Sequence, residues 1–433
     1  MLGTGDKERK MRKIRQGLII VCLAAVVGVL LLLLTCFIPA SRMYDNCLES
    51  YPIFEMESLY YSDPIFGRRL DNWSDSLMLL EAAYPGNEGK LDRAVNAYYN
   101  IIRDHNPCES FYLLYSGARS NTVKISYAWY WHGYLATLRP LFAHFDFSEI
   151  RNINTTVQIV LLLAVSYLFF KRYPSILIPF LLFIALLGPT AIAKSLHFSS
   201  VYYVLLIVLI TMLSNPWGKI DRDNVWRVFL LSGILTAYLD LLSAPTLSLT
   251  VPLCLLCVQL RGERSWKENM KVVIICTFFW FFGYAGMWSL KWVIAGIFQG
   301  QEFLSAVRTQ ILFRLSATGN HKTAVSRTRT LYLNWSTLFS DPALWYITIA
   351  YAAILLFAIF HKWKSLTWRR LADTLVFAFP ALIPLVWILL LCNHSRIHYW
   401  FSFRTLAPIV LSVLCALSSL AFPLPKKTES NAE

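Results

Sequence analysis

The run GLIIVCLAAVVGVLLLLLTCFI, at residues 17–38, contains no charged residue and decides the fold class of this chain. It is long enough to cross a bilayer as one helix, which takes about 20 residues. The basic, polar stretch MLGTGDKERKMRKIRQ, at residues 1–16, precedes it and favours a cytoplasmic N-terminus. A cleaved signal peptide would have an apolar run of about 7–15 residues, so this run is too long for one. We expect a first transmembrane helix that anchors the chain.

Apolar runs recur through the rest of the 433 residues, of which 56% are hydrophobic, and the mean hydropathy is +0.49. Such a composition predicts an all-α, polytopic transmembrane helical bundle. Together with the first helix we expect about ten spans, with the bundle at residues 151–421 and a cytoplasmic tail at residues 422–433. The nine further spans centre on residues 157–170, 175–188, 200–213, 225–242, 246–260, 272–290, 344–360, 374–391 and 405–420.

Basic loops separate these apolar runs on one side of the membrane. They carry the sequences KRYP, NPWGKIDRDN, RGERSWKENMK, HKWKSLTWRR and, in the tail, PKK. Alternation places all of them on the same side as the N-terminus, as the positive-inside rule requires. We therefore expect a multi-pass protein of the plasma (inner) membrane with both termini cytoplasmic. The rule also accounts for the sequence pI of about 9.3, so nucleic-acid binding is not expected.

Residues 39–150, the first outer segment, form the one long polar stretch between apolar runs and hold 14 of the 26 Asp and Glu residues. Within it, LDRAVNAYYNII at residues 91–102 has apolar residues at helical spacing. Residues 125–145 are rich in Trp and Tyr, which collect at membrane interfaces. We expect both stretches to be helices on the outer membrane surface, the second interrupted at Pro140.

The motif DNWSDSLMLLE, at residues 71–81, supplies two carboxylates four residues apart. On a helix, Asp71 and Asp75 would lie on one side and could share a metal ion or a substrate hydroxyl. The alternative is that Asp71 caps a helix that starts near Trp73.

Cations in the other outer segments depart from the positive-inside rule. They occur in an outer basic loop at residues 299–340 and in the stretch NHSRIHYWFSFR at residues 393–404. Arginine offers a planar fork suited to phosphate, so these residues indicate an anion site. They could instead bind lipid headgroups or pair with the acidic first outer segment. The candidate substrate-binding residues, including two from residues 125–145, are His132, Arg139, Arg314, Arg327, Arg329, His394, Arg396, His398 and Arg404.

This layout resembles that of the GT-C superfamily of membrane glycosyltransferases, which have an N-terminal span, a large acidic outer loop with interfacial helices, and further spans. The resemblance implies transfer of a sugar from a polyprenyl-phosphate or polyprenyl-diphosphate donor to an acceptor on the outer face. It also implies that Asp71 or Asp75 is the catalytic acidic residue, in DxxxD spacing, with Asp45, nearer the membrane, as the alternative. Membrane lipid and a lipid-linked sugar donor are the partners it implies.

The sequence leaves several alternatives open. A transporter or flippase for an anionic or lipid-linked substrate is a second class of function, and a non-catalytic assembly factor is a third. A divalent cofactor cation is an option, as is a disulfide between Cys47 and Cys108. Three charged residues, Lys194, Asp240 and Lys291, fall near the expected outer ends of spans, where we expect an interfacial position for each.

Overall fold

The structure is a computed structural model that describes residues 4–61, 63–117, 120–214, 223–262, 265–315 and 325–422. In these residues nearly all regular structure is helical, which confirms the all-α class. The predicted tail beyond Phe422 and most of the predicted loop at residues 215–224 lie outside the described residues. Short 3-10 turns occur at Ala40–Met43, Phe66–Arg68, Trp363–Ser365, Leu375–Phe377 and Phe403–Leu406.

All ten apolar runs are helical, but they differ in length. Among the described residues, seven helices or joined helices are long and apolar enough to cross a membrane, rather than the expected ten. These are α1 (Thr4–Thr35), α7 (Phe147–Arg172), α10 (Leu196–Ser214), α13 (Trp266–Gln299), α16 (Pro342–His361), α17 (Trp368–Thr374) with α18 (Ala378–Leu390), and α20 (Tyr399–Ser402) with α21 (Ala407–Ala421). The other three are shorter: α8 (Pro174–Leu186), α11 (Trp226–Leu239) and α12 (Leu247–Leu260).

Helices α11 and α13 make the most extensive helix–helix contact of the described bundle, and two glycines lie in their interface. A Cβ atom on Gly233 would lie 2.1 Å from the carbonyl oxygen of Trp280, and one on Gly283 would lie 2.5 Å from that of Leu230. Small residues let helix backbones approach each other closely, which increases dispersion contacts where lipid removes the hydrophobic drive. Around this pair, α10 packs on α7 and α12, and α21 packs on α8, α16 and α18.

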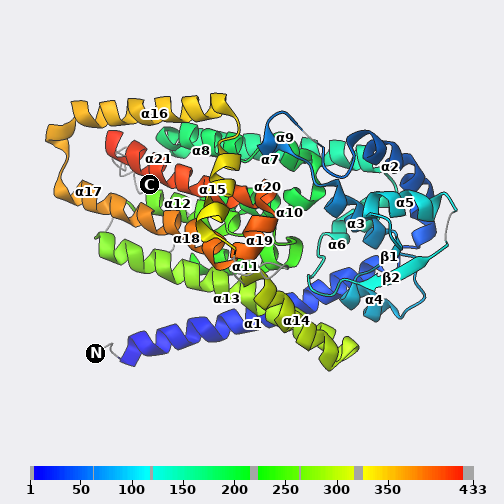
Figure 1. Cartoon of the computed structure of the whole chain (residues 1–433). Coiled ribbons are helices and arrows are strands. Elements are labelled where there is room, and N and C mark those ends of the chain that lie inside the picture. The colour runs from blue at the N-terminus through cyan, green and yellow to red at the C-terminus, as the bar shows by residue number, and fades with distance from the viewer. Residues whose placement is uncertain are drawn as a thin grey trace, which may run out of the picture.

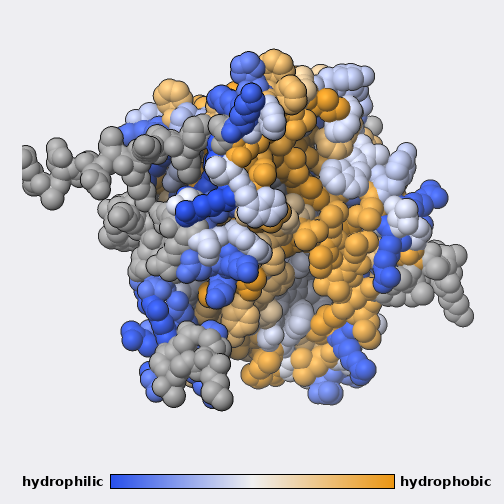
Figure 2. Space-filling model, turned by 90° about the vertical axis from the view of Figure 1, so that its left-hand side faces the viewer, coloured by the Kyte–Doolittle hydropathy of each residue, from blue (hydrophilic) through white to orange (hydrophobic). Residues whose placement is uncertain are grey.

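The first outer segment lies at one end of the bundle, and the start of α1 and the end of α21 lie at the other (Figure 1). At this second end of the bundle, basic residues contact the ends of helices, and we call it the basic end. Arg9 forms an ion pair with Asp223, and Arg172 Nη2 donates to the carbonyl oxygen of Ser214 at 2.6 Å. Figure 2 looks onto the basic end and shows groups of hydrophilic residues around hydrophobic surface.

The first outer segment contains α2 (Tyr44–Glu57), α3 (Asn72–Ala82), α4 (Lys90–Asn96), β1 (Tyr98–Ile102), α5 (Pro107–Tyr115), β2 (Thr122–Ser126) and α6 (Leu135–Phe142). The predicted helix at residues 91–102 is therefore wrong beyond residue 96. There Ala97 adopts a left-handed conformation, with φ of 44°, and β1 follows and pairs antiparallel with β2, Tyr98 opposite Ser126. The sequence YYNII is rich in the aromatic and β-branched residues that favour strands once a partner strand is present.

The prediction of one interfacial helix at residues 125–145 is also wrong in part. Residues up to Ser126 belong to β2, and the helix here, α6, starts at Leu135 and continues through Pro140 to Phe142. This helix packs against α1 and α3. The next helix, α7, begins at a capping box in which Asp146 and Glu149 each bond the other's backbone amide.

Short helices complete the fold between the long ones. Two of them, α14 (Gln301–Leu315) and α15 (Arg327–Leu338), occupy most of the described part of the predicted outer basic loop. The others are α9 (Pro189–Lys194) and α19 (Cys392–Ile397). Figure 1 shows α15, α19 and α20 close to the middle of the molecule, and α15 packs on α19 and α20.

Candidate functional site

Asp71 is the N-cap residue of α3, as one interpretation of the sequence predicted. Its carboxylate accepts hydrogen bonds from the backbone amide of Ser74 at 3.2 Å and from the Ser74 hydroxyl at 2.8 Å. The side chain is nevertheless only 3% exposed, which is unusual for an ionisable cap. A buried carboxylate needs further partners, and capping alone does not explain this one.

The further partner of Asp71 is His197, in the first turn of α10. His197 Nδ1 donates to Asp71 Oδ2 at 3.0 Å, and both side chains are buried. Burial by itself raises the pKa of Asp71. The hydrogen bond and charge of His197, together with the bonds from Ser74, outweigh burial and hold this pKa below its usual value. Asp71 is therefore an ionised carboxylate at neutral pH, with Oδ2 accepting two bonds and Oδ1 one.

Asp75 has a different set of partners, all at the N-terminus of α10. It accepts bonds from the Ser195 hydroxyl at 3.1 Å and from the backbone amides of Leu196 at 3.2 Å and His197 at 3.0 Å. These amides have no partner within the helix, and the helix dipole favours a negative charge there. Burial raises the pKa of Asp75 to about 6, although Arg151 and the His197 amide oppose this shift. The contacts make Asp75 an anchor for α10 rather than a free base.

The described residues offer no further ligands for a metal ion shared by Asp71 and Asp75. Each carboxylate is engaged by its own protein donors. Across the part of the chain that the structure describes, no group of three or more His, Cys, Asp or Glu residues is arranged to hold a metal ion.

Arg404 is the predicted cation that the fold brings to Asp71. Its side chain is buried, its Nε donates to the carbonyl oxygen of Leu187 at 2.8 Å, and its Nη2 donates to that of Gly67 at 3.3 Å. The remaining nitrogen, Nη1, is buried and has no hydrogen-bond partner among the described residues. The charges of Asp71 and Arg404 interact. Arg404 thus joins the first outer segment to the bundle and keeps one donor nitrogen unused.

His394 and His398 lie beside Asp71 and Arg404. Their ring centroids are 4.8 Å apart, and His394 Nε2 lies 3.1 Å from the carbonyl oxygen of Leu242. Burial lowers the pKa of His398 to about 4, although the charge of Asp71 opposes this shift. Burial also lowers the pKa of His394 well below its usual value. Both rings are neutral at pH 7, so the positive charges beside Asp71 are those of His197 and Arg404. We call Asp71, His197, His398 and Arg404 the junction cluster.

Four other predicted arginines, Arg314, Arg327, Arg329 and Arg396, lie elsewhere, so the structure does not gather the predicted cations into one anion site. Arg314 borders a separate cavity of about 250 Å³ lined by aromatic residues, among them Trp288 and Trp387, and its Nη2 donates to the Tyr130 hydroxyl at 3.1 Å. Arg327 and Arg329 are exposed at the start of α15, and Arg396 is half-buried on α19. Sequence position alone does not fix the face on which each side chain points.

Three predicted residues of the first outer segment lie away from the junction cluster. Asp45 is exposed on α2 and borders a different cleft. Arg139 Nη1 donates to the carbonyl oxygen of Ala82 at 2.6 Å and Nη2 to that of Ile38 at 2.8 Å, which ties the end of α3 to the end of α1. His132 has both ring nitrogens engaged, by the carbonyl oxygen of Tyr127 at 2.6 Å and by Tyr134 and Glu81. The hydrogen bonds of Arg139 and His132 therefore stabilise the interior of the first outer segment.

Sequence reasoning missed His197, and it placed Asp240 and Lys291 at the membrane interface. In the structure Asp240 and Lys291 are buried, whereas Lys194 is exposed. Lys291 donates to the carbonyl oxygen of Val95, and Asp240 accepts from the Ser243 amide and hydroxyl. In the sequence, His197, Asp240 and Lys291 are each a polar residue between two apolar residues within an apolar run. Such a residue usually faces a protein interior, and this pattern could have identified them.

Cys47 and Cys108 are free thiols in the structure, and both are buried. The Cys108 thiol lies 3.4 Å from the Ser76 hydroxyl and from the carbonyl oxygen of Asn72.

Comparison with known protein families, curated proteins and solved structures finds no match for the chain.

Proposed function

We propose that this protein is a GT-C-like membrane glycosyltransferase that moves a sugar from a polyprenyl-phosphate-type donor to an acceptor at the outer membrane face. One observation carries the proposal: the buried, ionised carboxylate of Asp71 lies where the first outer segment meets the bundle, within the field of Arg404. A base and a cation in one low-dielectric place are what glycosyl transfer from a lipid phosphate requires.

In the proposed reaction, Asp71 accepts the proton of the acceptor hydroxyl. The hydroxyl oxygen forms a bond to the anomeric carbon, the bond from that carbon to the phosphate oxygen breaks, and the polyprenyl phosphate leaves with the electron pair. Arg404 Nη1, which has no hydrogen-bond partner in the described part of the chain, stabilises the negative charge of the leaving phosphate. His197 is a positioning residue because it fixes the carboxylate through Nδ1. Since Asp71 is almost fully buried, the proposed reaction requires neighbouring side chains to move when substrate binds.

The proposed arrangement in the membrane has ten crossings in the plasma (inner) membrane with both termini cytoplasmic. It is supported by the gathering of basic residues, together with the start of α1 and the end of α21, at the end of the bundle opposite the first outer segment. The crossings comprise the seven long helices and the shorter α8, α11 and α12. A helix of 14 residues spans about 21 Å, so adjoining turns complete each shorter crossing.

The test is a transfer assay in nanodiscs with a panel of polyprenyl-phosphate sugars and extracted envelope acceptors, read out as released polyprenyl phosphate. The decisive variant is Asp71→Asn, because Asn caps a helix about as well as Asp but cannot take the proton. We expect turnover to fall by about 10²–10⁴-fold, the usual contribution of a general base. Asp104→Asn is the matched control, since Asp104 is exposed in the same outer segment and outside the junction cluster. It should retain wild-type turnover.

Two results would overturn the proposal. One is an Asp71→Asn variant that transfers at the wild-type rate, which would leave Asp71 as a cap and an ion-pair partner. The other is a wild-type protein that releases polyprenyl phosphate from no donor in the panel but moves labelled lipid-linked sugar between leaflets. That second result would establish the flippase alternative.

A further inference from the structure

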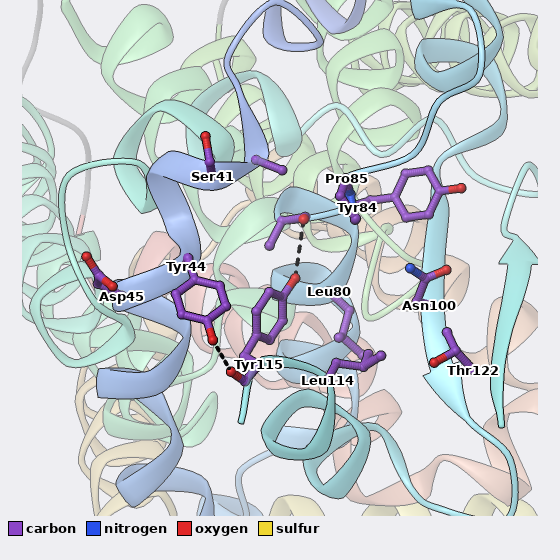
Figure 3. Close-up of a pocket in the computed structure, with 12 residues that line it drawn as sticks. Ser41, Tyr44, Asp45, Leu80, Tyr84, Pro85, Asn100, Leu114, Tyr115 and Thr122 are labelled. Atoms are coloured by element: carbon purple, nitrogen blue, oxygen red, sulfur yellow. Dashed lines mark hydrogen bonds between the residues drawn. The ribbon is translucent and has the colours of Figure 1, made fainter. Parts of the chain in front are cut away.

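A cleft of about 530 Å³ lies within the first outer segment, between α2, α5, the end of α3 and the β1–β2 ladder (Figure 3). Its volume falls within the range of small-molecule sites, about 300–1,000 Å³. Its closest approach to α3 is at Leu80, nine residues after Asp71, which corresponds to about 14 Å of helix. The cleft is therefore separate from the junction cluster.

The floor and the edges of the cleft differ in polarity. Leu80, Ala83 and Leu114 form a buried, apolar floor. Polar side chains stand at opposite edges: Ser41 and Asp45 on one side, Asn100 and Thr122 on the strands at the other (Figure 3). Among the described residues that line the cleft, Asp45 alone carries a charge. Such a cleft suits an uncharged ligand with an apolar face and hydroxyl groups at its edges, and it disfavours phosphate.

Two tyrosines are fixed at one side of the cleft. The Tyr44 hydroxyl donates to the carbonyl oxygen of Tyr115 at 2.7 Å, and the Tyr115 hydroxyl donates to that of Ala83 at 3.2 Å. The rings meet edge to face, with centroids 6.1 Å apart. Backbone carbonyl oxygens hold both hydroxyls, so the Tyr44 ring is already fixed. This ring is 39% exposed, and a ligand that binds to it costs little side-chain entropy.

We propose that this cleft binds an uncharged oligosaccharide of two to four sugar units. The C–H faces of sugar rings carry slight positive charge and stack on the negative face of an aromatic ring, here Tyr44 and Tyr115. The sugar hydroxyls reach Asp45 and Asn100 at the two edges, where a carboxylate accepts and an amide both donates and accepts. The site does not depend on the proposed transferase reaction, because none of its residues belongs to the junction cluster.

The experiment measures saturation-transfer NMR between the full chain in nanodiscs and a panel of uncharged tetrasaccharides. The panel contains glucose, galactose, mannose and N-acetylhexosamine units in α- and β-linkage, and a neutral tetrapeptide represents the peptide alternative. We expect at least one tetrasaccharide to bind, and Tyr44→Ala or Asn100→Ala to weaken it about tenfold or more. Ser41→Trp, which adds bulk at the edge of the cleft, should abolish binding.

Matched controls separate loss of the site from loss of the fold. Tyr61→Ala removes a tyrosine of similar exposure, 43%, that does not line the cleft, and Ser148→Trp adds the same bulk at an exposed position on α7. Both should bind like wild type. The proposal is overturned if no tetrasaccharide binds, if only the peptide binds, or if binding survives Ser41→Trp. Asp71→Asn should keep sugar binding, so the failure of this proposal and that of the transferase proposal are distinguishable.

Discussion

His197 Nδ1 lies 3.0 Å from Oδ2 of Asp71, although the two residues are 126 positions apart in the chain. The contact is buried and joins the cap of α3 to the first turn of α10, a helix long and apolar enough to cross a membrane. The backbone amide of the same histidine bonds Asp75 at 3.0 Å. One residue of α10 therefore orients both carboxylates of the DxxxD motif, and this gives the two acids different roles.

Asp75 is predicted to matter for stability. Asp75→Ala leaves the Ser195 hydroxyl and two backbone amides buried without an acceptor, each at a cost of about 1–3 kcal/mol. We expect a clearly lower unfolding temperature for Asp75→Ala and a smaller loss for Asp75→Asn, which keeps one acceptor oxygen. The buried cysteines report unfolding through thiol-reactive dye in a thermal ramp. Asp45→Asn is the control, and an Asp75→Ala variant as stable as it would contradict the anchoring role.

Arg404 is predicted to stabilise the transition state through its charge. Arg404→Gln should lower turnover by about 10²–10³-fold, the usual effect of removing one donor to a developing anion. Arg404→Lys, which keeps the charge without the fork, should recover part of the loss, and added guanidinium should raise the activity of Arg404→Gln. Arg329→Gln, at an exposed position, is the matched control. Equal activity of the Lys and Gln variants would assign Arg404 a purely structural role.

His398 is predicted to make stability depend on pH between about 6.5 and 4. Its folded pKa of about 4 lies below the unfolded value near 6.5, so the unfolded state binds the proton first. The stability that the neutral ring contributes is complete above pH 6.5 and is lost as the pH falls through this window, by up to about 3 kcal/mol. His398→Gln cannot take the proton, so its unfolding temperature should fall less between pH 7 and 4.5. Parallel pH profiles for the two proteins would refute this.

The ends of the bundle are predicted to face opposite sides of the membrane. Glu109, on α5, and Lys364, at the turn between α16 and α17, are both exposed. In whole cells, an impermeant maleimide should label Glu109→Cys and leave Lys364→Cys unlabelled until the membrane is opened. The background is a variant without exposed Cys22. Labelling of both positions in intact cells would contradict the proposed topology.

The sequence by itself determined the features that depend on neighbouring residues. Apolar runs became helices because a membrane leaves backbone groups no other partner, and Asp71 became a cap because its side chain reaches the amide three residues on. The basic loops likewise indicated which ends of the helices lie together.

The tertiary structure alone decided the partners of those features. Whether Tyr98–Ile102 continues a helix or forms a strand depends on the strand at Thr122–Ser126 beside it. Asp71 and Asp75 are four residues apart on one helix whether Asp71 is a helix cap or a catalytic acid. Only the approach of α10 gives one a histidine and the other a helix N-terminus. Arg404 reaches Gly67 across 337 positions for the same reason: buried polar groups must pair, and no local rule states with which residue.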